Sequence, residues 1–129
     1  MNSQLVWILP GTRVSTFLFP FYRHYGVVTE TGLVLSCSAR SGRAVAETFE
    51  AFSGGQEWRI EPPLSDLPRW MVLARAYELA DRAYHISDWN CETYVNVCFG
   101  LPPRSRQSEL TVAAAGLGLI AYAACRLAA

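Results

Sequence analysis

Two residues that lie far apart in the sequence are the best candidates for chemistry. His24 lies in "FPFYRHYGVV", where an aromatic and basic approach leads into an alternating apolar run typical of a β-strand. Cys91 lies in "DWNCETYVNVCFG", in the first turn of an expected helix. A helix dipole and free N–H groups there would stabilise a thiolate, and the same N–H groups could cradle an oxyanion. An imidazole held against this thiol would complete a Cys–His pair suited to acyl transfer.

These residues also have simpler structural interpretations. A single cysteine is more often a small buried hydrophobe than a nucleophile, and a single strand histidine is more often structural than a base. The second histidine, His85, fits a connector between two helices. Asn90 fits a helix cap, and Glu92 fits a favourable charge in a first helical turn.

The elements that must position the pair are mostly strands in the first half of the chain. We expect strands at 4–9 and 12–19, a hairpin of 24–28 and 33–39 that turns at 29–32, a short helix at 43–52, and a strand at 57–61. His24 would then belong to the first strand of the hairpin.

Helical patterns follow from Asp66 onward. Asp66 can cap a helix whose first turn contains Pro68. Its expected buried face consists of Trp70, Leu73, Ala74, Tyr77, Ala80 and Tyr84. A second helix is expected from about Asp88 to Gly100, with Cys91 in its first turn.

The tail from Leu110 to Ala129 has about the length needed to span a bilayer, with no charge before Arg126. It is composed mainly of Ala and Gly, however, so a buried or partner-bound helix is an equal alternative to a membrane helix.

Length and composition narrow the classes of function. The 129 residues suit one domain, and 11 basic residues balance 11 acidic ones. The charge therefore indicates no specific nucleic-acid partner. The start of the chain lacks the pattern of a signal peptide, so we expect its four cysteines to be free thiols. No ligand cluster or Gly-rich phosphate loop is present, so we expect no metal and no cofactor.

At this point the chain resembles a known family. "FPFYRHYGVV" is similar to the H-box, and "NCETYVNVCFG" to the NC motif, of the LRAT-like (lecithin retinol acyltransferase-like) thiol enzymes, which include the small phospholipase A/acyltransferases. The resemblance extends from about Pro10 to Gln107. It implies an α+β, permuted papain-like fold in which an antiparallel sheet packs on helices, with a domain at 1–107 and a hydrophobic helical tail at 108–129.

The resemblance also implies roles for individual residues. Cys91 would be the nucleophile and His24 the general base, with Asn90, Glu92 and Tyr25 flanking them in the motifs. The family carries a histidine or another polar residue to orient the base, and the matching position here is Ser36, twelve residues after His24. Because serine orients an imidazole poorly, we expect a nearly ordinary pKa for the Cys91 thiol and a degenerate site.

Two functions follow from the resemblance. "HYGVV" is most like the picornaviral 2A proteins of the H-box/NC type, which implies a non-structural protein of the host-cell cytoplasm that supports viral replication by binding a host protein or membrane lipid. Tyr22, Arg23 and Tyr25 could line such a surface or pack beneath the hairpin. Residues 110–129 could associate with intracellular membranes. The alternative is an active thiol phospholipase A/acyltransferase that forms an acyl-enzyme on Cys91.

Overall fold

One antiparallel β-sheet forms the centre of the molecule. The structure is a computed structural model that describes residues 7–18 and 22–128. The strands are β1 (Arg13–Leu18), β2 (Tyr22–Val28), β3 (Val34–Cys37), β4 (Ala44–Glu47) and β5 (Trp58–Ile60), in the order β4-β3-β2-β1-β5. All neighbouring strands are antiparallel. The expected α+β class with an antiparallel sheet is therefore confirmed.

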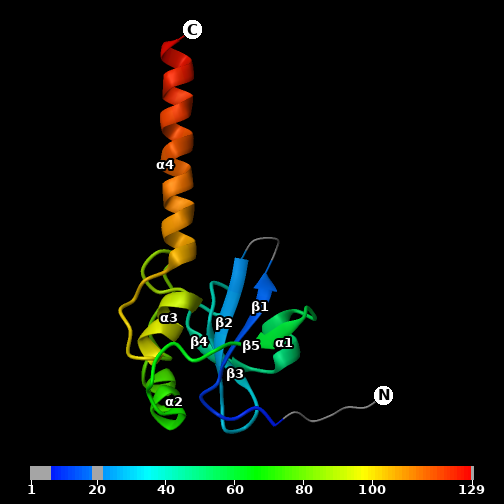
Figure 1. Cartoon of the computed structure of the whole chain (residues 1–129). Coiled ribbons are helices and arrows are strands. Elements are labelled where there is room, and N and C mark those ends of the chain that lie inside the picture. The colour runs from blue at the N-terminus through cyan, green and yellow to red at the C-terminus, as the bar shows by residue number, and fades with distance from the viewer. Residues whose placement is uncertain (1–6, 19–21, 129) are drawn as a thin grey trace.

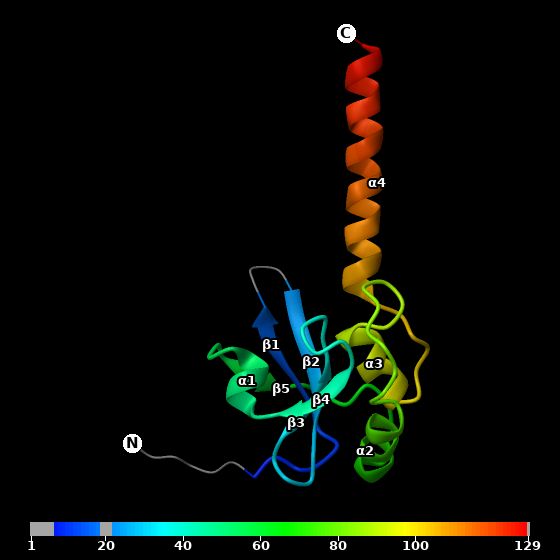
Figure 2. The ribbon, with the colours of Figure 1, turned by 180° about the vertical axis from the view of Figure 1, so that it is seen from behind.

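Helices cover both faces of this sheet (Figures 1 and 2). The helices are α1 (Phe49–Ser53), α2 (Arg69–Glu78), α3 (Cys91–Cys98) and α4 (Arg106–Leu127). The short α1 lies on one face, and α2 and α3 pack together on the other. The fourth helix extends away from the domain, with the C-terminus at its far end.

The alternation of β2 divides the core into two clusters. Val27 faces α2 and α3 and packs with Leu35, Tyr94 and Val95, whereas the next residue, Val28, packs with Phe52 on the α1 side. Successive strand side chains point to opposite faces, so a seven-residue strand can contribute to both clusters. The same alternation places His24 on the face that carries Val28.

The hairpin that carries His24 forms as the sequence predicts. Val27 pairs with Leu35 and Val28 with Val34, on either side of the turn at 29–32. In that turn the Thr29 hydroxyl accepts from the backbone N–H of Leu33, and Gly32 adopts a φ of 76°, which favours glycine. The expected strands at 12–19 and 57–61 correspond to β1 and β5.

The expected helix at 43–52 is wrong in its first half. Residues 44–47 form β4, and the helix begins only after Thr48, whose side chain accepts from the backbone N–H of Ala51. Thr48 therefore follows the strand and caps the helix. Ala and Glu residues, which favour helices, lie on both sides of it, so the sequence pattern does not reveal this boundary. The expected strand at 4–9 is also wrong for Trp7–Leu9, which lie outside any strand, while its first three residues lie outside the described residues.

The buried face predicted for the helix after Asp66 is correct for Leu73, Ala80 and Tyr84, which pack against the core, and wrong for Trp70 and Tyr77. Val72 and Ala76 are its buried residues, whereas Trp70 is 69% exposed and Tyr77 is 45% exposed. The small side chains of Val72 and Ala76 allow close packing against α3, where the Tyr94 hydroxyl donates to the carbonyl of Ala76 at 2.6 Å. Asp66 is not the cap. The N-cap residue is Pro68, and no side chain accepts a hydrogen bond from the first turn at that position.

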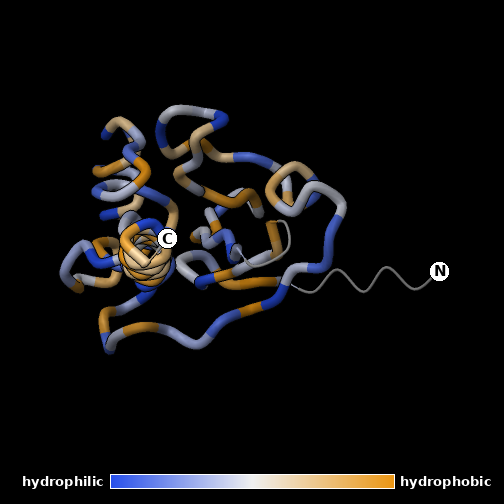
Figure 3. Tube along the Cα trace, turned by 90° about the horizontal axis from the view of Figure 1, so that it is seen from above, coloured by the Kyte–Doolittle hydropathy of each residue, from blue (hydrophilic) through white to orange (hydrophobic). Residues whose placement is uncertain are grey.

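A single long helix accounts for the tail. Its described side chains from Val112 to Leu127 are exposed, and Figure 3 shows the helix end-on, coloured mainly toward the hydrophobic end of the scale. Within the described part of the chain, none of the helices combines the length and the hydropathy needed to cross a membrane.

We expect Gly26→Ala to destabilise the domain, because an added Cβ would lie 2.4 Å from Val34 Cγ1 and 3.2 Å from a ring carbon of Phe52. Overpacking of this kind costs about 1–3 kcal/mol, which chemical denaturation would measure. Gly118→Ala is the control, since its Cβ would meet nothing within 4 Å. Equal stability of wild type and Gly26→Ala would show that Phe52 does not pack on this strand as described.

Candidate functional site

His24 is a buried strand histidine on the α1 face of the sheet. His24 is only 5% exposed, and its ring centroid lies 5.0 Å from that of Phe52. Position 24 faces this way because β2 alternates, and Gly26, the next residue on the same face, leaves room for Phe52. The "HYG" of the motif therefore combines a buried imidazole with the space that its aromatic neighbour needs.

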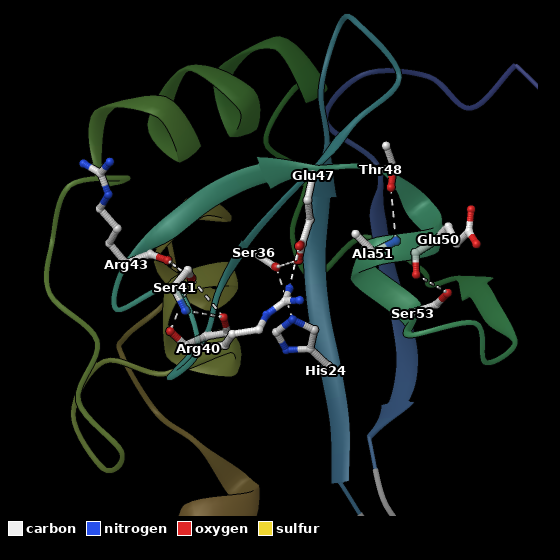
Figure 4. Close-up of polar contacts among 11 residues, drawn as sticks. His24, Ser36, Arg40, Ser41, Arg43, Glu47, Thr48, Glu50, Ala51 and Ser53 are labelled. Atoms are coloured by element: carbon white, nitrogen blue, oxygen red, sulfur yellow. Dashed lines mark hydrogen bonds and ion pairs between the residues drawn. The ribbon is translucent and has the colours of Figure 1, made fainter.

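Ser36 contacts His24, as the resemblance implies, and brings a carboxylate with it. Ser36 Oγ lies 3.1 Å from His24 Nε2 and donates to Glu47 Oε1 at 3.4 Å. Glu47 in turn forms an ion pair with Arg40 at 2.5 Å. Figure 4 shows this chain of side chains, from His24 on β2 through Ser36 on β3 to Glu47 on β4.

Ser36 links His24 to Glu47. The one hydrogen of its hydroxyl can go to the Glu47 carboxylate, and in that arrangement the Ser36 oxygen accepts from His24 Nε2–H and Nδ1 is the unprotonated ring nitrogen. Glu47 is therefore a positioning residue that sequence reasoning missed, because predicting a helix at 43–52 hid its place on the strand beside Ser36.

The surroundings of His24 make it a weak base. Burial, together with the nearby Arg40 guanidinium, lowers the pKa of the imidazole from its ordinary 6.5 to about 4. The imidazole is therefore neutral at physiological pH.

Cys91 lies at the start of α3, beside a part of β2 that has no neighbouring strand. β2 and β3 pair over only two residues each, which leaves the backbone of Arg23 and Tyr25 unpaired by β3. The thiol of Cys91 lies in this place, where its Sγ donates to the carbonyl of Arg23 at 3.8 Å. The thiol hydrogen is thus directed at a backbone carbonyl.

The Cys91 thiol is harder to ionise than an ordinary thiol. Burial raises its pKa from 9.0 to about 11, and the negative charge of Glu92 adds to the increase. The backbone N–H groups near the sulfur favour the thiolate but do not offset the burial. The expectation of a nearly ordinary pKa is therefore wrong, because it considered the helix dipole and the missing base without the desolvation.

Two of the N–H groups expected to cradle an oxyanion are already bonded. Asn90 caps α3, and its Oδ1 accepts from the backbone N–H groups of Glu92 and Thr93, each at 3.1 Å. The Thr93 hydroxyl completes a capping box by accepting from the N–H of Asn90 at 2.7 Å. The interpretation of Asn90 as a helix cap is confirmed, and this cap withdraws two amides from any reacting group.

His24 and Cys91 nevertheless line one cavity of about 390 Å³. Leu18, Tyr22 and Phe52 give part of its wall an apolar character, and Arg40 adds a positive charge. Among the described residues, no hydrogen bond joins the imidazole of His24 to the thiol of Cys91. The sequence motifs thus bring the two residues to the same cavity, while the partners of each are elsewhere.

Glu92 does more than place a negative charge in the first turn of α3. Its carboxylate accepts from the Ser105 hydroxyl and the backbone N–H of Arg106, both at 2.9 Å, and from the N–H of Gln107 at 3.3 Å. These are the amides that begin α4 and have no partner within the helix. The residue after Cys91 therefore caps α4.

Gln107 fixes the same end of α4 to β2. Its side-chain amide pairs with the backbone of Arg23 in both directions, accepting from the N–H at 2.8 Å and donating to the carbonyl at 3.0 Å. One glutamine thus replaces part of the strand that β2 lacks. No sequence pattern indicated this contact, because the two residues are far apart in the chain.

Two further candidates, Tyr25 and His85, lie outside the cavity of His24 and Cys91. Tyr25 faces α3 and lines a separate cavity with Arg13, whose guanidinium lies 5.4 Å from the tyrosine ring centre. His85 is exposed and contacts Ser87 and Asp88 in the connector between α2 and α3, which agrees with its structural interpretation.

The fold and site define a class: an α+β domain with a cysteine at a helix N-terminus beside a strand histidine. The comparisons add no relative to it, since no protein-family model matches the chain and no curated protein matches it. Four features of the site bear on the resemblance: His24, Cys91, Ser36 at the third position, and the cavity that His24 and Cys91 share.

We expect His24 to make the domain less stable in acid. The unfolded chain binds a proton at His24 near pH 6.5 and the folded chain only near pH 4, so stability is present above pH 6.5 and is lost as pH falls toward 4. The loss is about 3 kcal/mol, measured by denaturant unfolding at several pH values. His24→Gln should remove this part of the slope, and the control His85→Gln should retain it. An unchanged slope in His24→Gln would contradict a buried neutral imidazole.

Proposed function

We propose that this chain is a permuted papain-like H-box/NC domain of the LRAT-like type in which the Cys–His site is dormant. It works by binding other molecules, a host protein or membrane lipid in the replication setting that the resemblance to picornaviral 2A proteins implies. The observation that carries the proposal is the state of the thiol. Cys91 donates its hydrogen to the Arg23 carbonyl and has a pKa of about 11.

The neighbouring base supports a dormant site. A general base works best with a pKa near the operating pH, whereas burial lowers the pKa of His24 to about 4. With the thiol pKa above pH 7 and the imidazole pKa below it, both groups are uncharged. Transfer of the thiol proton to the imidazole is therefore unfavourable in this arrangement.

The bonded amides support the same proposal. Stabilisation of an oxyanion by preorganised donors is often the largest part of catalysis in acyl transfer. Two amides at the start of α3 are held by Asn90 at 3.1 Å. The local structure that keeps α3 stable thus competes with the chemistry that its first turn could perform.

An active phospholipase A/acyltransferase is the second candidate, and the cavity is the observation that favours it. His24 and Cys91 share about 390 Å³ of space with apolar walls, and Ser36 with Glu47 orients the imidazole. In this reaction the Cys91 sulfur attacks an ester carbonyl while His24 Nδ1 takes the thiol proton. His24 then returns the proton to the leaving alcohol, and water or an amine releases the acyl group.

Alkylation of the intact protein separates the two functions, because Cys125 is exposed and serves as an internal control. With iodoacetamide at pH 7, we expect Cys125 to react first and Cys91 to remain at least tenfold slower, as peptide mass spectrometry would show. Incubation with phospholipid vesicles should leave no acyl group on Cys91. Faster alkylation of Cys91 than of Cys125, or an acyl-cysteine at position 91, would establish the enzyme instead.

Ser36→His tests whether the third position is responsible for the dormant state. A histidine there can donate to Glu47 and bond to His24, so we expect faster alkylation of Cys91 and a lower thiol pKa. Ser36→Ala is the matched control, which removes the hydroxyl without adding a base. No difference between the two variants would show that burial of the Cys91 thiol, and not the residue at position 36, keeps the thiol inactive. In the viral setting, Cys91→Ala should leave replication largely intact.

A further inference from the structure

The contacts that the described residues show between α4 and the rest of the domain lie at its first turn. Glu92 caps it, Gln107 joins it to the backbone of Arg23, and Arg104 pairs with Glu109 at 3.0 Å. Beyond this point its large apolar side chains are exposed, among them Leu110, Leu117, Ile120 and Leu127. An apolar helix with a fixed start and an uncovered length is suited to bind a partner that supplies the missing apolar surface.

The spacing of these residues favours a second helix as that partner. A single stripe contains Leu110, Ala113, Leu117, Ile120, Ala124 and Leu127, with alternating spacings of three and four residues. This is the heptad spacing that places successive side chains against a neighbouring helix. We call these six residues the α4 seam.

The residues that flank the seam permit close approach. Ala114, Gly116, Ala121 and Ala123 lie beside it and have little or no side chain. Gly116 and Gly118 have open space around the position of a Cβ, so nothing in the domain covers this part of the helix. Two such helices can therefore pack backbone to backbone more closely than helices with bulky flanks.

The order of residues in the seam indicates the orientation. Read from either end, the seam has Leu, then Ala, then a large branched residue, so an antiparallel copy would oppose Leu110 to Leu127, Ala113 to Ala124 and Leu117 to Ile120. Large residues then meet large ones and the alanines meet each other. The antiparallel arrangement also brings the end with Glu109 near the end with Arg126 and aligns the helix dipoles favourably.

We propose that α4 pairs with α4 of a second copy of this chain, in antiparallel orientation, through the α4 seam. The two domains then lie at opposite ends of the helix pair, because each α4 extends away from its own domain (Figure 1). The seam is shorter than the roughly three to four heptads typical of a coiled coil, so we expect a weak dimer that dissociates on dilution. This pairing does not depend on whether Cys91 is active.

Leu117→Glu and Leu119→Glu in the full chain form a matched pair of tests. Leu117 is 68% exposed and lies in the seam, while Leu119 is 70% exposed and lies on another side of the same helix. Both substitutions keep a good helix former. Sedimentation equilibrium across micromolar concentrations should show the wild type and Leu119→Glu as dimers, and Leu117→Glu weakened at least tenfold.

Each other outcome overturns the proposal. A wild-type protein that stays monomeric at 200 µM would exclude the pair, and equal weakening by the two substitutions would show that the seam is not the interface. If vesicles of phosphatidylcholine and phosphatidylserine bind the monomeric chain, and both substitutions reduce that binding alike, a membrane covers α4 instead. Circular dichroism verifies that every variant retains its helix.

Cysteine cross-linking tests the orientation in a Cys125→Ala background. In the antiparallel pair, Leu110→Cys of one copy faces Leu127→Cys of the other. A mixture of the two variants should therefore form a disulfide under mild oxidation, while each variant alone should not. A disulfide between two copies of Leu110→Cys alone would show a parallel pair and overturn the proposed arrangement.

Discussion

The backbone of β2 at Arg23 needs hydrogen-bond partners that no strand provides, and much of the structure follows from that need. β3 pairs with β2 only near the turn and then continues beside β4. An unpaired backbone group that is shielded from water is costly. Gln107 supplies a donor and an acceptor, and the thiol of Cys91 supplies a further donor. The start of α3, the start of α4 and the candidate site are thereby joined at one residue.

This arrangement explains why the same residues serve stability more directly than chemistry. Cys91 lies close to the sheet because its thiol bonds to the strand, and that proximity excludes water and raises the thiol pKa to about 11. Glu92 caps α4, and its charge raises the same pKa. Asn90 stabilises α3 with the amides that an oxyanion would need. Each structural contact thus acts against ionisation or against reaction.

The sequence predicted the parts of the structure that depend on local patterns. The β2–β3 hairpin and the Asn90 cap follow from alternation and capping preference, and the resemblance implied the contact of Ser36 with His24. Local patterns could not predict contacts between distant segments. The contacts made by Glu47, Gln107 and Glu92 form only when the strands and helices pack. Trp70 and Tyr77 were wrongly placed on the buried face of α2 for a related reason. Size complementarity with α3 selected Val72 and Ala76 over the larger aromatic residues.

The state of the candidate site therefore depends on several contacts that act together. Replacing Ser36 by a stronger hydrogen-bonding partner changes the base but leaves the thiol bonded to Arg23 and the amides bonded to Asn90. Exposing Cys91 would lower its pKa, but it would also leave the Arg23 carbonyl with one donor fewer. A shift of α3 relative to β2 would separate the thiol from Arg23, and two contacts oppose it: Glu92 of α3 binds the start of α4, and Gln107 of α4 binds Arg23. The position of α4 is thus coupled to the site through the same backbone that holds the cysteine.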